Sequence, residues 1–235
     1  MHLTIDIGNT RGKWALFEGD QLVRSGNLAD GLPEGWRNWK TMVCATGDTD
    51  LNTLGLDRAP RLTADTPLPI VLDYATPETL GADRIAAACG AQRVGRAGCA
   101  KVIVDSGTCI TIDLLDGEGA YHGGAILPGI AMKFRALHTF TAKLPLLDYS
   151  IEKGRHYVTG RSTHESMAAG VLTATRYEVE GFVRHYRKQI DNVEVILTGG
   201  DAEQLIGEGG LAAEECRVVP QLVMIGMNEI LKLMA

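Results

Sequence analysis

Two short stretches of the sequence place an aspartate two residues before a glycine and follow that glycine with amide or hydroxyl side chains. The first runs from Asp6 to Thr10 and the second from Asp105 to Thr108. Glycine lets a backbone approach a ligand closely, and successive amide N–H groups in a tight turn bind anions. An aspartate repels phosphate, so a cation must lie between the two groups. The two stretches therefore predict a site for ATP with magnesium.

The first stretch differs from the phosphate loop of Walker-type nucleotide-binding proteins. That loop needs the pattern GxxxxGK followed by Ser or Thr, whose hydroxyl binds magnesium. Here only three residues separate Gly8 from Gly12, and Trp14 follows Lys13. The residues on both sides have the alternation typical of strands. The glycines therefore join strand to strand, whereas a Walker loop joins a strand to a helix.

Both stretches occupy the same place in a repeated strand–turn–strand unit. Each follows an apolar strand, and each is followed by an alternating strand and an acidic glycine turn, at residues 18–20 and 116–117. Such repetition predicts a duplication, although two ordinary hairpins would also use Asp and Gly in their turns. Alternating helices and strands follow in each half, which predicts mixed sheets. We expect an α/β protein with duplicated domains at 1–98 and 99–235, five-stranded sheets and a cleft between them.

Composition excludes several classes of protein. The net charge of −6 over 235 residues argues against a nucleic-acid partner. No apolar run is long enough to span a membrane, and no secretory signal is visible. The histidines lack the spacing of metal ligands. The odd number of cysteines without a CxxC pair indicates reduced thiols in a cytosolic protein. These cysteines are Cys44, Cys89, Cys99, Cys109 and Cys216.

Seven motifs, in this order, resemble those of the type III pantothenate kinases, a family of the acetate and sugar kinase, Hsp70 and actin superfamily. The resemblance covers nearly the whole chain and implies two actin/ribonuclease H-like domains. The motifs are DIGNTRGK (6–13), YATPETLGADR (74–84), DSGTCITID (105–113), GGAILPG (123–129), TAKLP (141–145), STHESMAAG (162–170) and LTGGD (197–201).

The resemblance implies ATP-dependent phosphorylation of pantothenate, the first step of coenzyme A synthesis, by a cytoplasmic homodimer. Asp83 would be the general base, Asp105 would bind potassium or ammonium, and Asp6 would approach magnesium through water. The implied ATP-binding residues are Asp6, Ile7, Gly8, Asn9, Thr10, Arg11, Gly12, Lys13 and Thr108. The implied pantothenate-binding residues are Tyr74, Gly81, Ala82, Asp83, Arg84 and Thr163, the last reaching across the dimer interface.

The residues around Asp83 support the same chemistry without the family. Thr76 and Pro77 are typical of the first positions of a helix, which would place Asp83 near its beginning, where the helix dipole keeps a carboxylate ionised. Phosphoryl transfer needs such a carboxylate beside the attacking hydroxyl. Arg84 would offer paired donors to the carboxylate of pantothenate. A salt bridge between Asp83 and Arg84, or a solvated Arg84, remains the alternative.

Other residues have plain structural interpretations. Lys13 could be a surface lysine, Tyr74 a rim residue, and Cys109 an inert, half-buried thiol. Residues 161–190 predict a long helix whose apolar stripe packs as core, with a share in a dimer interface. The stripe comprises Met167, Val171, Val179, Phe182, Tyr186 and Ile190.

Two other functions stay open at this point. The chain could be a non-catalytic accessory or regulatory relative, or a kinase of the same fold with another alcohol substrate. Intact Asp6, Asp83, Arg84 and Asp105 favour an enzyme, because a regulator needs no base.

Overall fold

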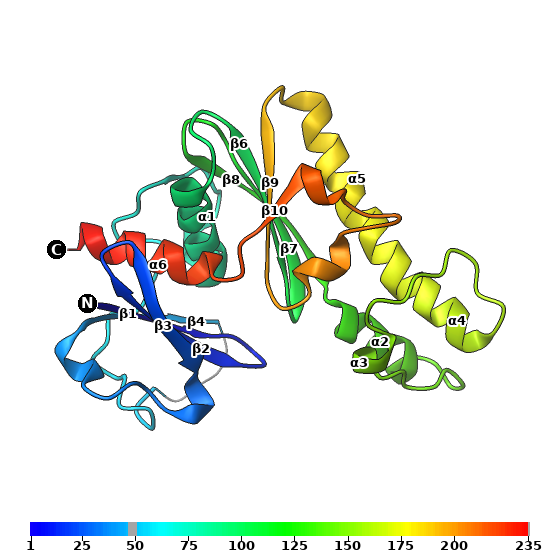
Figure 1. Ribbon diagram of the computed structural model, residues 1–235, viewed down its shortest axis with the longest axis horizontal. Helices are drawn as coiled ribbons and strands as arrows, with labels where there is room; N and C mark the ends of the chain where they lie inside the picture. Colours follow the sequence, from blue (N-terminus) through cyan, green and yellow to red (C-terminus); the bar gives the residue numbers. More distant parts are fainter. Residues whose placement is uncertain (47–50, 235) are drawn as a thin grey trace. The chain divides into compact units, whose positions relative to one another are not determined.

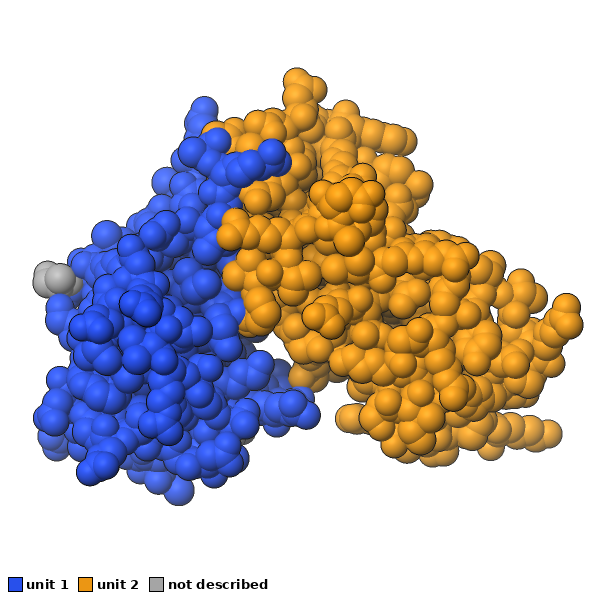
Figure 2. All heavy atoms as spheres, in the orientation of Figure 1, with its two compact units in different colours: residues 1–97, 115–123, 221–235 blue, residues 98–114, 124–220 orange. Residues whose placement is uncertain are grey.

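The computed structural model describes residues 1–46 and 51–234, which form two compact units (Figure 2). Unit 1 comprises residues 1–97, 115–123 and 221–235, and unit 2 comprises residues 98–114 and 124–220. The first boundary lies one residue from the predicted one. Residues 115–123 and 221–235, however, belong to unit 1, whereas the sequence placed both segments in the second domain.

The sheet of unit 1 has four strands in the order β3-β2-β1-β4 (Figure 1). Its strands are β1 (His2–Ile7), β2 (Gly12–Glu18), β3 (Gln21–Asn27) and β4 (Lys40–Ala45). Hairpins join the first three strands, which are antiparallel, and β4 runs parallel to β1. The predicted mixed pairing is therefore confirmed in this sheet. Short 3-10 turns lie at Leu28–Asp30, Trp36–Asn38 and Pro77–Thr79.

Helices α1 (Ala82–Val94) and α6 (Leu222–Leu233) pack closely against each other in unit 1. Small residues make this approach possible: a Cβ on Gly226 would lie 1.8 Å from the carbonyl oxygen of Ala86. Almost every residue of α1 from Arg84 to Ala91 is buried. Apolar residues of α6 are also buried, so this helix completes the core of unit 1 although it ends the chain. Because of this packing, residues 221–235 belong to unit 1, whereas the prediction placed them in the second domain.

The second sheet has six strands in the order β10-β9-β6-β7-β8-β5. Its strands are β5 (Val71–Leu72), β6 (Ala100–Ser106), β7 (Cys109–Leu115), β8 (Ala120–Pro128), β9 (Val193–Thr198) and β10 (Cys216–Val218). The prediction of two five-stranded sheets is wrong for the described residues. Strand β5 comes from the first half of the chain but pairs with Ala120 and Tyr121 of β8. Among the described residues, the far side of β4 in the first sheet carries an isolated bridge between Val43 and Arg61.

Unit 2 contains the predicted long helical segment. It consists of α4 (Thr163–Ala168), a π-helical turn (Ala169–Thr173) and α5 (Ala174–Gln189). From the predicted stripe, Met167, Val171 and Val179 are buried. Phe182 and Tyr186 are partly buried against a cluster that includes side chains of β6, β7 and β9. The predicted core stripe is thus confirmed at these positions, and α5 covers one face of these strands (Figure 1).

The remaining helices of unit 2 are short. They are α2 (Ile130–Thr139), α3 (Tyr149–Glu152) and the 3-10 turns Ala202–Leu205 and Ala213–Glu215. Across residues 1–46 and 51–234, no helix combines the length and apolar character needed to cross a membrane.

Candidate active site

The first aspartate–glycine stretch forms the turn between β1 and β2. The Gly8 N–H donates a hydrogen bond to the Arg11 carbonyl oxygen at 3.1 Å, which closes the turn. Ile7 points into the core, whereas Asn9, Thr10 and Arg11 are exposed. The turn therefore presents polar groups and backbone to a ligand while its base is anchored in the sheet.

Asp6 lies at the end of β1, between two neighbouring strands. Its partner across the antiparallel ladder is Lys13, and its partner across the parallel ladder is Cys44. The Cys44 thiol donates a hydrogen bond to the Asp6 carboxylate. Register alone therefore brings an ammonium group and a thiol to the two sides of this carboxylate.

Asp83 is the second residue of α1. The helix begins at Ala82, with Gly81 at the N-cap position. The predicted start at Thr76 and Pro77 is wrong, because Pro77 begins a separate 3-10 turn and Leu80 is extended. The placement of Asp83 near a helix start is nevertheless confirmed. Its Oδ1 atom accepts a hydrogen bond from the Arg84 backbone N–H at 2.9 Å.

Glycine at position 81 leaves room for the Asp83 carboxylate. A Cβ on Gly81 would lie 2.6 Å from Asp83 Oδ1. Such a contact is shorter than the van der Waals distance, so any larger residue would displace the carboxylate or the helix start. Close packing against the Asp83 carboxylate therefore explains why glycine occupies position 81.

The carboxylates of Asp6 and Asp83 are electrostatically coupled. Burial, followed by the nearby negative charge of Asp83, raises the pKa of Asp6 from its usual 3.8 to about 6. Lys13 and the Cys44 hydrogen bond oppose this rise without cancelling it. Two carboxylates that share one region favour a proton or a metal cation between them. Carboxyl groups with a strongly raised pKa are also characteristic of functional sites.

Arg84 lies beside two tyrosine rings in unit 1. Its guanidinium carbon is 6.0 Å from the ring centroids of both Tyr74 and Tyr121, and the side chain is 7 % exposed. The alternative of a solvated Arg84 is therefore wrong. The two ring centroids are 6.0 Å apart at an angle of 53°. Aromatic faces attract a guanidinium and fix its plane, which suits recognition of a carboxylate.

Tyr121 was not among the residues selected from the sequence. It is fully buried in β8, directly before the His122-Gly123 pair. Its alternating strand pattern is that of an ordinary core residue, so nothing in the sequence separated it from the many other buried side chains. Only the pairing of β5 with β8 places it beside Arg84.

The second aspartate–glycine stretch joins β6 to β7 in unit 2. The Gly107 N–H donates to the Cys109 carbonyl oxygen at 2.9 Å, and Thr108 is exposed. Asp105 is half-buried beside Gly199, where an added Cβ would lie 2.5 Å from Asp105 Oδ1. The buried Ser106 Oγ has no hydrogen-bond partner among the described residues. Cys109 is half-buried and free, as predicted.

Thr163 is the exposed first residue of α4 in unit 2. The Ser162 Oγ accepts a hydrogen bond from the Glu165 N–H at 3.2 Å, and Glu165 accepts one from the Arg161 N–H at 2.7 Å. These bonds cap the helix and fix its first turn. Of the candidate residues, those at 6–13, Tyr74 and 81–84 belong to unit 1, whereas Asp105, Thr108 and Thr163 belong to unit 2.

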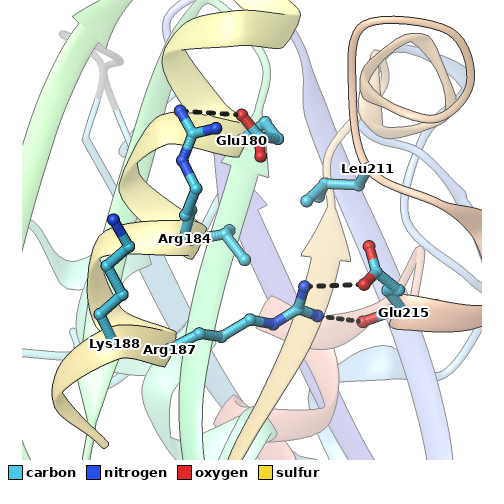
Figure 3. Close-up of a pocket in the computed structure, with 7 residues that line it drawn as sticks. Glu180, Arg184, Arg187, Lys188, Leu211 and Glu215 are labelled. Carbon is cyan, nitrogen blue, oxygen red and sulfur yellow. Dashed lines mark hydrogen bonds and ion pairs between the residues drawn. The ribbon is translucent and has the colours of Figure 1, made fainter.

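Figure 3 shows a pocket of about 210 Å³ in unit 2 that contains none of the candidate residues. Its basic groups are partly neutralised, because Arg187 binds Glu215 at 3.1 Å and Arg184 binds Glu180 at 3.4 Å. A shallower hollow of about 190 Å³ in unit 1 is lined by Lys13 and Trp14. The size of a pocket therefore does not identify the site here, and the titratable groups do.

Protein side chains alone do not form a metal centre in the part of the chain that the structure describes. No three His, Cys, Asp or Glu residues there are grouped so as to hold an ion. This arrangement is compatible with magnesium, which commonly uses one or two carboxylates together with the phosphates of a substrate.

Comparison with known proteins gives matches over the whole chain. The family model for type III pantothenate kinase matches residues 56–185. A type III pantothenate kinase from Phocaeicola vulgatus is 39% identical over 213 residues, covering 86% of each chain. One from Cytophaga hutchinsonii is 37% identical over 238 residues, covering 98% of each chain.

Solved structures with low sequence identity share the fold. A proposed 2-dehydro-3-deoxygalactonokinase from Sinorhizobium meliloti has a TM-score of 0.56 at 10% identity, covering 100% of this chain and 99% of its own. Component A of (R)-2-hydroxyglutaryl-CoA dehydratase from Acidaminococcus fermentans has a TM-score of 0.51 at 14% identity, covering 98% of this chain and 96% of its own. The two sheets with their helices thus have the fold of these structures, and the chain belongs to the type III pantothenate kinase family.

Proposed function

We propose that the protein transfers the γ-phosphoryl group of ATP to pantothenate, giving 4′-phosphopantothenate and ADP in the first step of coenzyme A synthesis. Family membership supports the reaction. One observation carries the assignment to this site: Asp83 lies at a helix start, and its negative charge adds to burial in raising the pKa of the neighbouring Asp6 to about 6. The Asp83 carboxylate, close to Asp6 and to the polar turn that follows it, suits proton abstraction next to a bound polyphosphate.

Asp83 is the general base in this reaction. The pantothenate hydroxyl gives its proton to the Asp83 carboxylate while the hydroxyl oxygen forms a bond to the γ-phosphorus. The bond between that phosphorus and the bridging oxygen breaks, and ADP leaves with the electron pair. The hydrogen bond from the Arg84 N–H and the absence of a side chain on Gly81 orient the carboxylate before substrate binds.

The two turns hold the phosphates. In the first turn we assign this role to the segment from Asp6 through Ile7, Gly8, Asn9, Thr10, Arg11 and Gly12 to Lys13. Support comes from the exposure of the turn side chains and from Lys13, which is exposed beside Asp6. In the second turn the exposed Thr108 hydroxyl is a donor for phosphate oxygens.

We assign a cation to each aspartate. Asp6 fits magnesium held through water, because a cation would relieve the repulsion from Asp83. Asp105 fits potassium or ammonium, because the neighbouring buried Ser106 Oγ, which has no hydrogen-bond partner among the described residues, offers a further oxygen. Magnesium, when bound, neutralises charge that develops on the phosphoryl oxygens.

Pantothenate binds beside Asp83 in this proposal. Arg84 pairs with its carboxylate, and Tyr74, Gly81 and Ala82 line the site. The burial of Arg84 beside two rings supports this role, because a fixed guanidinium can bind a carboxylate through two donors. Thr163 completes the site from a second subunit.

A homodimer is supported by apolar side chains on the surface of unit 2. These side chains are 59% to 85% exposed and are available for burial in an interface between subunits. They belong to Ile126, Phe140, Leu146, Ile151 and Val158. Sedimentation equilibrium of the pure protein should give twice the chain mass of 25.3 kDa, and a monomer at micromolar concentration contradicts the shared site. Five free cysteines and acidic composition support a cytoplasmic location.

An assay of ADP and phosphopantothenate formation tests the proposal. Pure protein is incubated with magnesium, ATP and potassium, and with pantothenate, glucose or acetate as acceptor. We expect rapid turnover with pantothenate alone, and about a thousandfold lower kcat in Asp83→Asn. Asp57→Asn, which replaces an exposed aspartate elsewhere in unit 1, is the matched control and should keep full activity.

The other outcomes distinguish the alternatives. Nucleotide binding without ADP release with any acceptor favours a non-catalytic relative. Turnover with glucose or acetate but not with pantothenate favours a kinase with another acceptor. Full activity in Asp83→Asn refutes the general base.

A further inference from the structure

His122 lies between two carboxylates in unit 1. Its Nε2 atom is 2.8 Å from Asp116 Oδ2, and its Nδ1 atom is 3.0 Å from Asp73 Oδ2. Asp116 belongs to the turn between β7 and β8, and Asp73 directly follows β5. One imidazole ring therefore connects three segments of the sheet edge.

The His122 bridge adds side-chain contacts beside β5, a strand with little backbone pairing of its own. Strand β5 has only two residues, Val71 and Leu72, and pairs with β8 at the end of the sheet. Beyond it, the Asp73 N–H donates to the Tyr121 carbonyl oxygen at 3.0 Å. Two-residue pairing provides little cooperative stabilisation, so side-chain contacts determine where the next residues lie.

The next residue along the chain is Tyr74, whose ring is one of the two that contact Arg84. Tyr121, the other ring, precedes His122 on β8. The bridge thus holds both segments that carry the rings. A displacement of Asp73 would move Tyr74 and remove its ring from the Arg84 guanidinium.

Asp116 is itself fixed. Its Oδ1 atom accepts hydrogen bonds from the N–H groups of Glu118 at 2.9 Å and Ala120 at 2.8 Å, which leaves Oδ2 for His122. His122 therefore has a rigid anchor on one side and the Tyr74 segment on the other.

We propose that His122 is a positioning residue for pantothenate binding, which fixes Tyr74 and thereby Arg84 by bridging Asp73 to Asp116. This inference rests on the proposed function, in which Arg84 binds the carboxylate of pantothenate. An isolated exposed ion pair contributes little, but two bonds on one ring form a network that resists displacement.

The protonation state of His122 gives the bridge a measurable signature. The hydrogen bond with Asp116, followed by that with Asp73, raises the pKa of His122 above its usual 6.5. The imidazolium donates to both carboxylates, whereas neutral imidazole has a single N–H and turns a lone pair towards the other carboxylate. The bridge therefore weakens as the pH rises through this pKa.

The test is the kinetics of His122→Gln with pantothenate varied at saturating ATP and with ATP varied at saturating pantothenate. We expect the KM for pantothenate to rise roughly tenfold while kcat and the KM for ATP stay within twofold. The wild-type KM for pantothenate should rise as the pH rises above the His122 pKa, and the variant should lack this step. His185→Gln, on an exposed histidine of α5, is the matched control and should leave all constants unchanged.

Asp73→Asn provides a second route to the same contact and leaves the anchor at Asp116 in place. It should raise the KM for pantothenate in the same direction, which keeps the test valid if His122→Gln does not fold. An unchanged KM for pantothenate in either folded variant, or an equal rise in the KM for ATP, overturns the positioning role. Wild-type protein that phosphorylates no pantothenate refutes the proposed function and this inference with it. Wild-type activity with an unaltered variant refutes the inference alone.

Discussion

The two aspartate–glycine turns have similar sequences and different surroundings. In the first turn, a Cβ on Gly8 would be 3.5 Å from its nearest neighbour, the Arg11 carbonyl oxygen, which is an ordinary contact. In the second, Gly199 lies against the turn with a φ of +90°, and its Cβ would be 2.3 Å from the Ser106 carbonyl oxygen and 2.5 Å from Asp105 Oδ1. The turn glycines themselves have similar room, because a Cβ on Gly107 would be 3.9 Å from its nearest neighbour, the Cys109 carbonyl oxygen. The second turn differs in that Gly199 packs directly against its backbone.

The aspartates differ in the same way. Asp6 has a neighbouring carboxylate, Asp83, and a raised pKa. Asp105 lies beside a backbone segment and the buried hydroxyl of Ser106. The repeated motif thus specifies a turn, whereas the neighbouring segments give each turn its own electrostatic surroundings. The two carboxylates at the first turn fit the proposed magnesium, and the buried oxygens at the second fit the proposed monovalent cation.

Alanine substitutions at Gly199 and Gly8 should show the largest difference in stability between the surroundings of the two turns. Gly199→Ala adds atoms where backbone already lies and requires a left-handed conformation, so we expect a loss of about 3 to 5 kcal/mol in the free energy of unfolding. Gly8→Ala should lose less than about 1 kcal/mol. Urea denaturation of both variants measures the difference. Equal losses would mean that Gly199 packs no more closely than Gly8.

The substitution Asp6→Asn should test the electrostatic difference between the two aspartates. Because the folded-state pKa of Asp6 is raised from 3.8 to about 6, the protonated carboxyl stabilises the fold fully below pH 3.8, and this contribution disappears as the pH rises through 6. The shift of the Asp6 pKa corresponds to about 2 to 3 kcal/mol in the free energy of unfolding. Asp6→Asn should therefore be more stable than wild type at pH 8 by up to that amount and equally stable at pH 4.

Denaturation of Asp6→Asn and wild type at pH 4, 6 and 8 measures this effect. The same variant should lose activity, because the proposed magnesium contact is removed. A variant that is less stable than wild type at pH 8 would show that Asp6 ionisation does not oppose folding in the absence of ligand.

Exchange of the monovalent cation should give the smallest effect. With magnesium constant, replacing potassium by sodium or lithium should lower kcat about tenfold, because a space lined by oxygens favours a larger and more easily dehydrated ion. Asp105→Asn should abolish the difference between the salts. Identical rates of the wild type in all three chlorides would count against a cation at the second turn.

Several features of the fold and site follow from local sequence. The hairpins around both turns, the mixed pairing of the first sheet, and the helix start near Asp83 were predictable because alternation, turn residues and hydrophobic periodicity act over a few neighbouring positions. The long helical segment was predictable for the same reason, although its π-helical turn was not.

Other features depend on contacts between distant segments. Strand β5 joins the second sheet through backbone pairing with β8, and α6 returns to the first unit because its apolar face is buried against partners far away in sequence. The role of Tyr121 beside Arg84 and the link through His122 depend on the same pairing.

The sequence by itself determined two polar turns, a carboxylate near a helix start, and membership of a kinase family, because each is encoded in residue types at short spacing. Only the tertiary structure decided that Asp6 and Asp83 share one electrostatic environment, that Arg84 lies buried beside two rings, and that Gly199 packs against the second turn. Those properties arise from close packing and desolvation, which depend on atoms that the folded chain brings together from distant positions.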